Sequence, residues 1–226
     1  MKKIAAEFIG TFTLIFAGTG AIVIDGASHG AITHVGVALT FGLVVLAMIY
    51  TLGDLSGAHL NPAVTLGFWA ARRFPAKELP RYLAAQISGA LLASCILKFL
   101  FPADENLGAT HPAGTSTQSF ILEFILTFIL MFVILNVSTG AKEKGITAGI
   151  AVGAVIALEA LFAGPICGAS MNPARSLAPA LASGNLSNLW IYLLAPTLGA
   201  AAAVLACFCV RENCCCSNRL NCANEN

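Results

Sequence analysis

One motif occurs twice in this sequence, as Gly57-Ala58-His59-Leu60-Asn61-Pro62-Ala63 and as Gly168-Ala169-Ser170-Met171-Asn172-Pro173-Ala174, and it sets the architecture of the chain. Asparagine is a favoured N-cap residue, and proline is favoured at the first helical position because its missing N–H is not needed there. Each copy therefore predicts that a helix begins at its Asn-Pro pair.

The two helices that begin there are too short to cross a membrane. The apolar stretches Asn61–Ala70 and Asn172–Ala182, at about 1.5 Å per residue, reach only about halfway through the hydrocarbon. The glycine-rich runs Gly53–Ala58 and Gly164–Ala169 in front of them are expected to be extended loops. Backbone of this kind is tolerated at membrane depth only where it lines a water-filled cavity or is buried in protein. Two such loops imply a lined path through the membrane.

The composition around the motifs is that of a membrane protein. The 226 residues are 58% hydrophobic and only 10% charged, whereas a soluble domain carries about 25% charged residues. The net charge of +1 suggests no nucleic-acid partner. The first apolar stretch contains Glu7 and lacks a signal-peptide cleavage pattern, so it is interpreted as a spanning helix. Six stretches approach the required length of about 20 residues, the fifth being the shortest: Ile4–Ile24, His34–Leu52, Tyr82–Phe101, Phe120–Thr139, Ile146–Phe162 and Leu189–Val210.

The basic residues predict the orientation of these spans. If both termini are cytoplasmic, the cytoplasmic segments contain most of the 12 lysines and arginines, as the positive-inside rule requires: Lys2, Lys3, Arg72, Arg73, Lys77, Arg81, Lys142, Lys144, Arg211 and Arg219. The exceptions are Lys98 and Arg175. A full crossing at Asn61 would carry Arg72 and Arg73 outside, so this segment is predicted to re-enter the membrane and return to the same side.

The two halves of the chain are related. Span one contains Glu7-Phe8-Ile9-Gly10-Thr11-Phe12, and span four contains Glu123-Phe124-Ile125-Leu126-Thr127-Phe128. Each unit has three spans, so the second unit begins at the opposite membrane face. This predicts an inverted repeat with broken helices that meet near the bilayer midplane. The repeats occupy about 4–101 and about 118–210 of one membrane domain, 1–210, followed by a Cys-rich tail, 211–226.

The repeat predicts a specific electrostatic arrangement. Each half-helix directs the positive end of its dipole, about half an elementary charge, at the centre of the membrane. Cations, including hydronium, meet a barrier there, while the amides of Asn61 and Asn172 can donate to a passing oxygen atom and loop carbonyls can accept. The sequence therefore predicts a passive pore for uncharged molecules.

On these motifs the sequence resembles the aquaporin, or major intrinsic protein, family from residue 4 to about 210. The resemblance implies an all-α membrane protein with six transmembrane helices and two re-entrant half-helices, without a cofactor, a metal or an enzymatic activity. It also implies a homotetramer in the bilayer of a plasma or inner membrane, with one pore per subunit. The residues implied at the central constriction are Asn61, Pro62, Ala63, Asn172, Pro173 and Ala174, and those implied at an outer selectivity filter are Phe41, Ala160, Ala169 and Arg175.

The filter implied by the resemblance is unlike that of the water-selective members, which typically carry His at the position of Ala160. A methyl group in place of imidazole widens the constriction and removes a donor. The filter is similar to that of nodulin-like and metalloid-permeable members, as is Tyr192-Leu193, whereas Ser176 and Ala180 follow the water-channel pattern. This favours glycerol, boric acid or arsenous acid as solutes alongside water, with a strict water channel as the alternative. A shift of one residue would place Glu159 at the constriction.

Four further residues have candidate roles. The resemblance implies that Glu7 and Glu123 each bind the backbone of a re-entrant loop, the alternative being a proton relay. His59 either lines the cytoplasmic vestibule or is a buried, hydrogen-bonded histidine. Cys167, five residues before Asn172, is expected near the pore mouth, where mercurials would reach it.

Two features leave other functions open. Six of the eight cysteines lie within residues 207–222; on the cytoplasmic side they would stay reduced and could be palmitoylated, bind a thiophilic metal or metalloid, or have no role. Secondary transporters also use inverted repeats, but apart from Glu159 no acidic residue is placed near Asn61 or Asn172 to bind a coupling ion. Saturable, ion-driven uptake would distinguish a transporter.

Overall fold

Six long helices and two short ones make up the computed structural model, which describes residues 1–138 and 142–210. Each of the six long helices is long and apolar enough to cross a membrane, by length and composition. The predicted membrane fold is thereby confirmed, while the tail at 211–226 lies outside the described residues. The long helices are α1 (Lys2–Ala27), α2 (Thr33–Ser56), α4 (Leu79–Leu100), α5 (Ser116–Val137), α6 (Lys142–Cys167) and α8 (Leu189–Val210); the short ones are α3 (Pro62–Ala70) and α7 (Pro173–Ser183), with a 3-10 turn η1 at Ala76–Glu78.

The loops in front of the short helices are shorter than expected. Helix α2 continues through Gly53 and α6 continues through Gly164, so the prediction of extended loops over Gly53–Ala58 and Gly164–Ala169 is wrong for most of each run. In lipid, every backbone group needs an internal partner, which favours continuing the helix. The helices end only where Gly57 (φ 88°) and Gly168 (φ 85°) adopt the left-handed conformation that commonly terminates helices.

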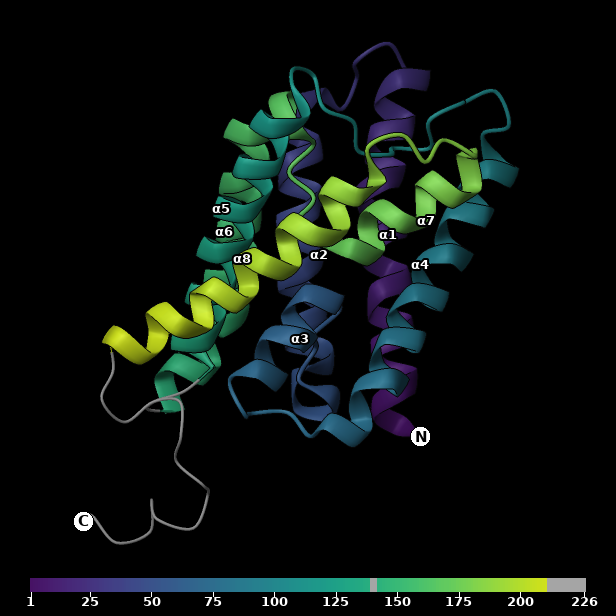
Figure 1. The fold of residues 1–226 in the computed structure, drawn as a ribbon. Coiled ribbons are helices and arrows are strands. Elements are labelled where there is room, and N and C mark those ends of the chain that lie inside the picture. Colours follow the sequence, from purple (N-terminus) through teal and green to yellow (C-terminus); the bar gives the residue numbers. More distant parts are fainter. Residues whose placement is uncertain (139–141, 211–226) are drawn as a thin grey trace, which may run out of the picture.

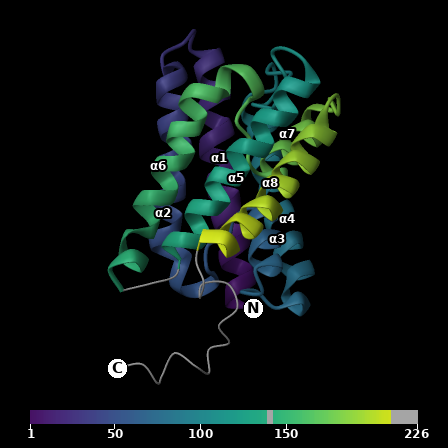
Figure 2. The ribbon, with the colours of Figure 1, turned by 60° about the vertical axis from the view of Figure 1, so that its left-hand side comes forward.

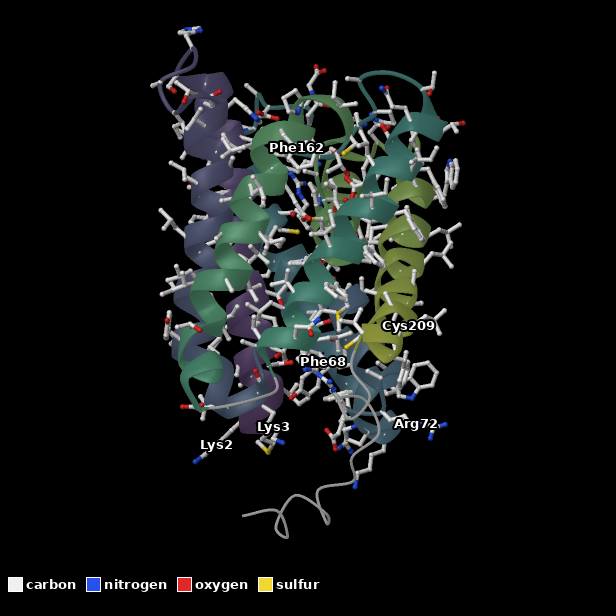
Figure 3. All side chains as sticks on the ribbon, turned by 90° about the vertical axis from the view of Figure 1, so that its left-hand side faces the viewer. Lys2, Lys3, Phe68, Arg72, Phe162 and Cys209 are labelled. Atoms are coloured by element: carbon white, nitrogen blue, oxygen red, sulfur yellow. The ribbon has the colours of Figure 1, made fainter. Side chains whose placement is uncertain are left out.

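The two short helices enter the bundle from opposite ends. Helix α3 lies in the half of the bundle that holds the N-terminus, α7 lies in the other half, and the end of α8 returns to the N-terminal end (Figure 1). Lys2, Lys3 and Arg72 lie at that same end, whereas Phe162 lies toward the opposite one (Figure 3). The segment containing α3 therefore enters and leaves on one side, as a re-entrant segment must.

Glycines allow the helices of each repeat to cross closely. A Cβ atom on Gly89 of α4 would collide with the carbonyl oxygen of Phe8 in α1, and one on Gly199 of α8 would collide with that of Phe124 in α5. The same contact thus occurs once in each half, as an inverted repeat requires. Small residues at helix crossings are the usual means of close packing in membranes.

The two repeats join where α2 packs along α6, which lie side by side in Figure 2. A Cβ atom on Gly42 of α2 would lie 2.6 Å from the carbonyl oxygen of Gly153 in α6, and the reverse substitution would be equally close. This backbone contact fixes the position of one repeat against the other. The two glycines are as far apart in the sequence as Asn61 and Asn172, so they are equivalent positions of the repeats, and by the same spacing Glu159 corresponds to Met48.

Polarity is distributed as in a membrane protein. Large apolar side chains face outward, including Phe99, which is 84% exposed, and Leu205, which is 67% exposed. Glu7 and Glu123 are 0% exposed and Arg175 is 3% exposed. Ionisable groups inside a membrane bundle face its interior and mark functional paths, so these three residues point to the site.

Candidate functional site

The two short helices begin at the two Asn-Pro pairs, as the motifs predict. Asn61 is the N-cap of α3, and its side-chain oxygen accepts a hydrogen bond from the Ala63 amide at 2.8 Å. Asn172 is the N-cap of α7, and its oxygen accepts from the amides of Ala174 at 3.0 Å and Arg175 at 3.3 Å. Both side chains are consequently held at the positive ends of the half-helix dipoles.

The same asparagines connect the two re-entrant loops. Asn61 Nδ2 donates to the Met171 carbonyl oxygen at 2.7 Å, and Asn172 Nδ2 donates to the Leu60 carbonyl oxygen at 3.0 Å. An amide NH₂ has two hydrogens, so each asparagine uses one to hold the opposite loop and keeps one available to a solute. Sequence reasoning assigned these amides to the solute alone and did not foresee the bonds between the loops.

Glu7 binds the first loop through both carboxylate oxygens. Its Oε1 accepts from the His59 amide at 3.0 Å and its Oε2 accepts from the Leu60 amide at 2.8 Å. Ser56 Oγ and Gln86 Nε2 complete the set, donating at 2.7 and 2.8 Å. A carboxylate with four donors is a structural anchor, which favours the loop-support interpretation over the proton relay.

Glu123 binds the second loop in the same manner. It accepts from the Ser170 amide at 2.7 Å and from the Met171 amide at 2.9 Å. Both loops need this support because non-glycine residues in them adopt left-handed backbone conformations, a disfavoured state. These residues are Ala58 (φ 45°), Leu60 (φ 52°), Ala169 (φ 41°) and Met171 (φ 54°).

A cavity of about 110 Å³ runs past both asparagines. Its wall includes His59 and Phe68 toward the N-terminal end and both re-entrant loops at the centre. Beyond the loops, toward the opposite end, its wall contains all four residues at the filter positions, Phe41, Ala160, Ala169 and Arg175. Glu159 is not on this wall: it is 1% exposed, and neither of its carboxylate oxygens has a hydrogen-bond partner in the described part of the chain.

Arg175 is held at the cavity wall by two contacts. Its Nη1 donates to the Gly108 carbonyl oxygen at 2.7 Å, and its guanidinium carbon lies 5.1 Å from the centroid of the Phe41 ring. Its Nε has no partner among the described residues. Sequence reasoning missed Gly108, whose only signal is its residue type: a Cβ atom there would lie 2.9 Å from Cβ of Thr19.

His59 both lines the cavity and is packed and hydrogen-bonded, so it combines the two alternatives considered for it. It lies on the cavity wall, and its ring is also packed and hydrogen-bonded. The ring centroid lies 4.6 Å from that of Phe68 and 5.3 Å from that of Tyr82. Its Nδ1 is 3.2 Å from Thr65 Oγ1, so the ring presents a fixed, largely aromatic surface to this part of the cavity.

Cys167 does not lie where it was expected. Its side chain is 0% exposed, it is not on the cavity wall, and its Sγ lies 3.5 Å from the Ala163 carbonyl oxygen. The expectation of a thiol at the pore mouth is wrong because α6 extends to Cys167 and turns this side chain into the bundle. A mercurial therefore has no direct route to it from the cavity.

The fold and the cavity together define a multi-pass membrane channel. A model of the major intrinsic protein family matches residues 1–207, and the chain belongs to this family, as the motifs suggest. It is 50% identical over 207 residues to aquaporin NIP1-1 of Oryza sativa subsp. japonica, covering 91% of this chain and 73% of that protein. It is 46% identical over 203 residues to nodulin-26 of Glycine max, covering 89% and 75%.

The fold is also similar to a solved structure. The X-ray structure of the aquaglyceroporin from Plasmodium falciparum superposes with a TM-score of 0.82 at 28% sequence identity, covering 90% of this chain and 93% of that chain. The predicted six-span channel fold is confirmed by this similarity.

Proposed function

We propose that this protein is a passive channel that conducts glycerol, boric acid or arsenous acid together with water, and that it excludes ions and protons. The observation that carries the proposal is the part of the cavity wall formed by the four filter residues, which we take as the constriction: two of them, Ala160 and Ala169, have only methyl side chains. A constriction with two methyl groups leaves room for a solute larger than water. The similarity to an aquaglyceroporin structure supports the same solute class.

The contacts around the cavity explain how such a pore selects. A neutral polyol can replace its water hydrogen bonds with the free N–H of Asn61, that of Asn172 and the guanidinium of Arg175, because all three residues line the cavity. Its carbon atoms can face Phe41 and the apolar remainder of the wall. A cation cannot recover its hydration there, because it meets the guanidinium of Arg175 and the positive ends of two helix dipoles.

The other candidate functions have weaker support. The residues Ser176 and Ala180 favour a strict water channel, but neither is on the cavity wall. A secondary transporter needs a site for a coupling ion, and the described cavity wall contains no acidic side chain. Glu7 and Glu123 are occupied by loop amides.

Flux measurements test the solute class directly. In stopped-flow assays of proteoliposomes, we expect both water and glycerol to cross at least about tenfold faster than in protein-free liposomes, which corresponds to a barrier lower by about 1.4 kcal/mol. Proteoliposomes that contain the wild-type protein and enclose a proton-sensitive dye should show no proton leak above the rate of protein-free liposomes. Glycerol entry at the rate of empty liposomes would leave the strict water channel as the better proposal.

We further propose a homotetramer in a plasma or inner membrane with the N-terminal end of the bundle in the cytoplasm. Lys2, Lys3 and Arg72 all lie at that end (Figure 3), which supports this orientation. The apolar outer faces of the long helices leave surface for neighbouring subunits or lipid. Mass measurement of the detergent-solubilised protein should give four chains, and a monomeric mass would contradict the assembly.

A further inference from the structure

Helix α6 contains a proline close to the constriction. Pro165 has no amide hydrogen, so the carbonyl oxygen of Leu161, four residues earlier, lacks its normal helical donor. A carbonyl group at membrane depth needs another partner. The position of this carbonyl group matters, because Leu161 directly follows the filter residue Ala160.

The missing donor is supplied from another helix. His34 Nε2, from the first turn of α2, lies 2.8 Å from the Leu161 carbonyl oxygen. A carbonyl oxygen can only accept, so Nε2 carries the hydrogen and donates it. Gly164 makes room for the ring, since a Cβ atom there would lie only 3.0 Å from Cε1 of His34.

This bond and one backbone contact bracket the constriction. On α2, Phe41 lies two helical turns beyond His34 and immediately before Gly42, which packs on Gly153 of α6. On α6, Ala160 lies between Gly153 and Leu161. The two helices that carry Phe41 and Ala160 are therefore joined on both sides of these residues.

We propose that His34 is a positioning residue of the constriction, whose imidazole replaces the amide hydrogen that Pro165 lacks and thereby fixes the separation of Phe41 from Ala160. The inference rests on the proposed function for its solute readout only, since the bond itself joins two helices whatever the solute. It assigns to an exposed histidine in the first turn of α2 a role in selectivity that its surface position alone does not suggest.

A double-mutant cycle between His34 and Pro165 tests this pairing. His34→Leu, which removes the donor, should change the ratio of glycerol to water permeability by about threefold or more and lower the Tm by about 2–4 °C. His34→Gln, which retains an N–H, should restore most of both. In the Pro165→Ala background residue 165 supplies its own N–H to Leu161, so His34→Leu should then change the ratio and the Tm by much less than in the wild-type background.

A control variant and the glycerol flux of the wild type distinguish a failure of this proposal from a failure of the proposed solute class. His29→Asn serves as the control, because His29 is an exposed histidine in the loop before α2 with a φ of 57°, which asparagine tolerates; we expect it to behave as the wild type. Equal effects of His34→Leu in both backgrounds, or no effect in either, would overturn the proposal. If the solute class were wrong instead, wild-type glycerol flux would equal that of empty liposomes while the Tm still showed the coupling.

Discussion

Glu123→Gln is expected to lower the stability of this channel by about 1–3 kcal/mol and to reduce its flux per reconstituted protein by about tenfold or more. The carboxylate accepts from two neighbouring amides, those of Ser170 and Met171, through different oxygens. Glutamine has only one oxygen, so its NH₂ group would face one of these amides, donor against donor. A buried donor left without an acceptor costs about 1–3 kcal/mol.

The loop held by Glu123 explains why the effect should reach the pore. Ala169 and Met171 are in the left-handed region, where a non-glycine residue persists only if its surroundings hold it. The Met171 carbonyl oxygen also accepts the hydrogen bond from Asn61. Releasing this loop therefore disturbs Asn61, Asn172 and the Ala169 wall together, and the damage is not confined to one contact.

Glu159→Gln provides the matched control. Glu159 is as deeply buried as Glu123, but it has no hydrogen-bond partner among the described residues, it is off the cavity wall, and its counterpart in the first repeat is Met48. We expect the Tm and the water flux of the Glu159→Gln variant to stay near wild-type values. Thermal melts in detergent and stopped-flow water flux compare the two variants, and equal losses in both would contradict the anchoring role of Glu123.

The features that could be predicted from the sequence are those that depend on local chemistry. The Asn-Pro pairs specify a helix start by capping and by the fixed φ of proline, and α3 and α7 begin as expected. The lengths of the apolar stretches and the positions of basic residues gave the spans, and Leu189–Val210 matches α8 residue for residue.

The errors arose where tertiary surroundings outweigh local propensity. Glycine and proline at Gly164 and Pro165 indicate a loop in water, yet α6 continues through both, since lipid favours a helix and His34 supplies the missing donor. The support of Arg175 by Gly108 could not be foreseen, because the residues 101–115 between α4 and α5 have no recognisable motif. The bonds between the two loops depend on the two repeats meeting, which no single segment encodes.

Ala160→His is expected to reduce glycerol permeability by about tenfold or more while water permeability stays within about threefold of the wild type. The imidazole would extend from α6 into the part of the cavity bounded by Phe41 and Arg175. The walls cannot move apart to compensate, because the Gly42–Gly153 backbone contact and the His34–Leu161 hydrogen bond join α2 to α6 on both sides of this position. Packed interiors also resist expansion. Water is small enough to pass, and the added N–H gives it another donor.

Ala160→Ser separates size from polarity in the same assay. The hydroxyl adds a hydrogen-bonding group with little volume, so glycerol flux should stay within about threefold of the wild type if size decides the selection. A loss of glycerol flux in Ala160→Ser would show that polarity decides it. If glycerol still crossed Ala160→His at the wild-type rate, the narrowest point of the path would lie elsewhere, and the section of the cavity beside Asn61 and Asn172 would become the next candidate.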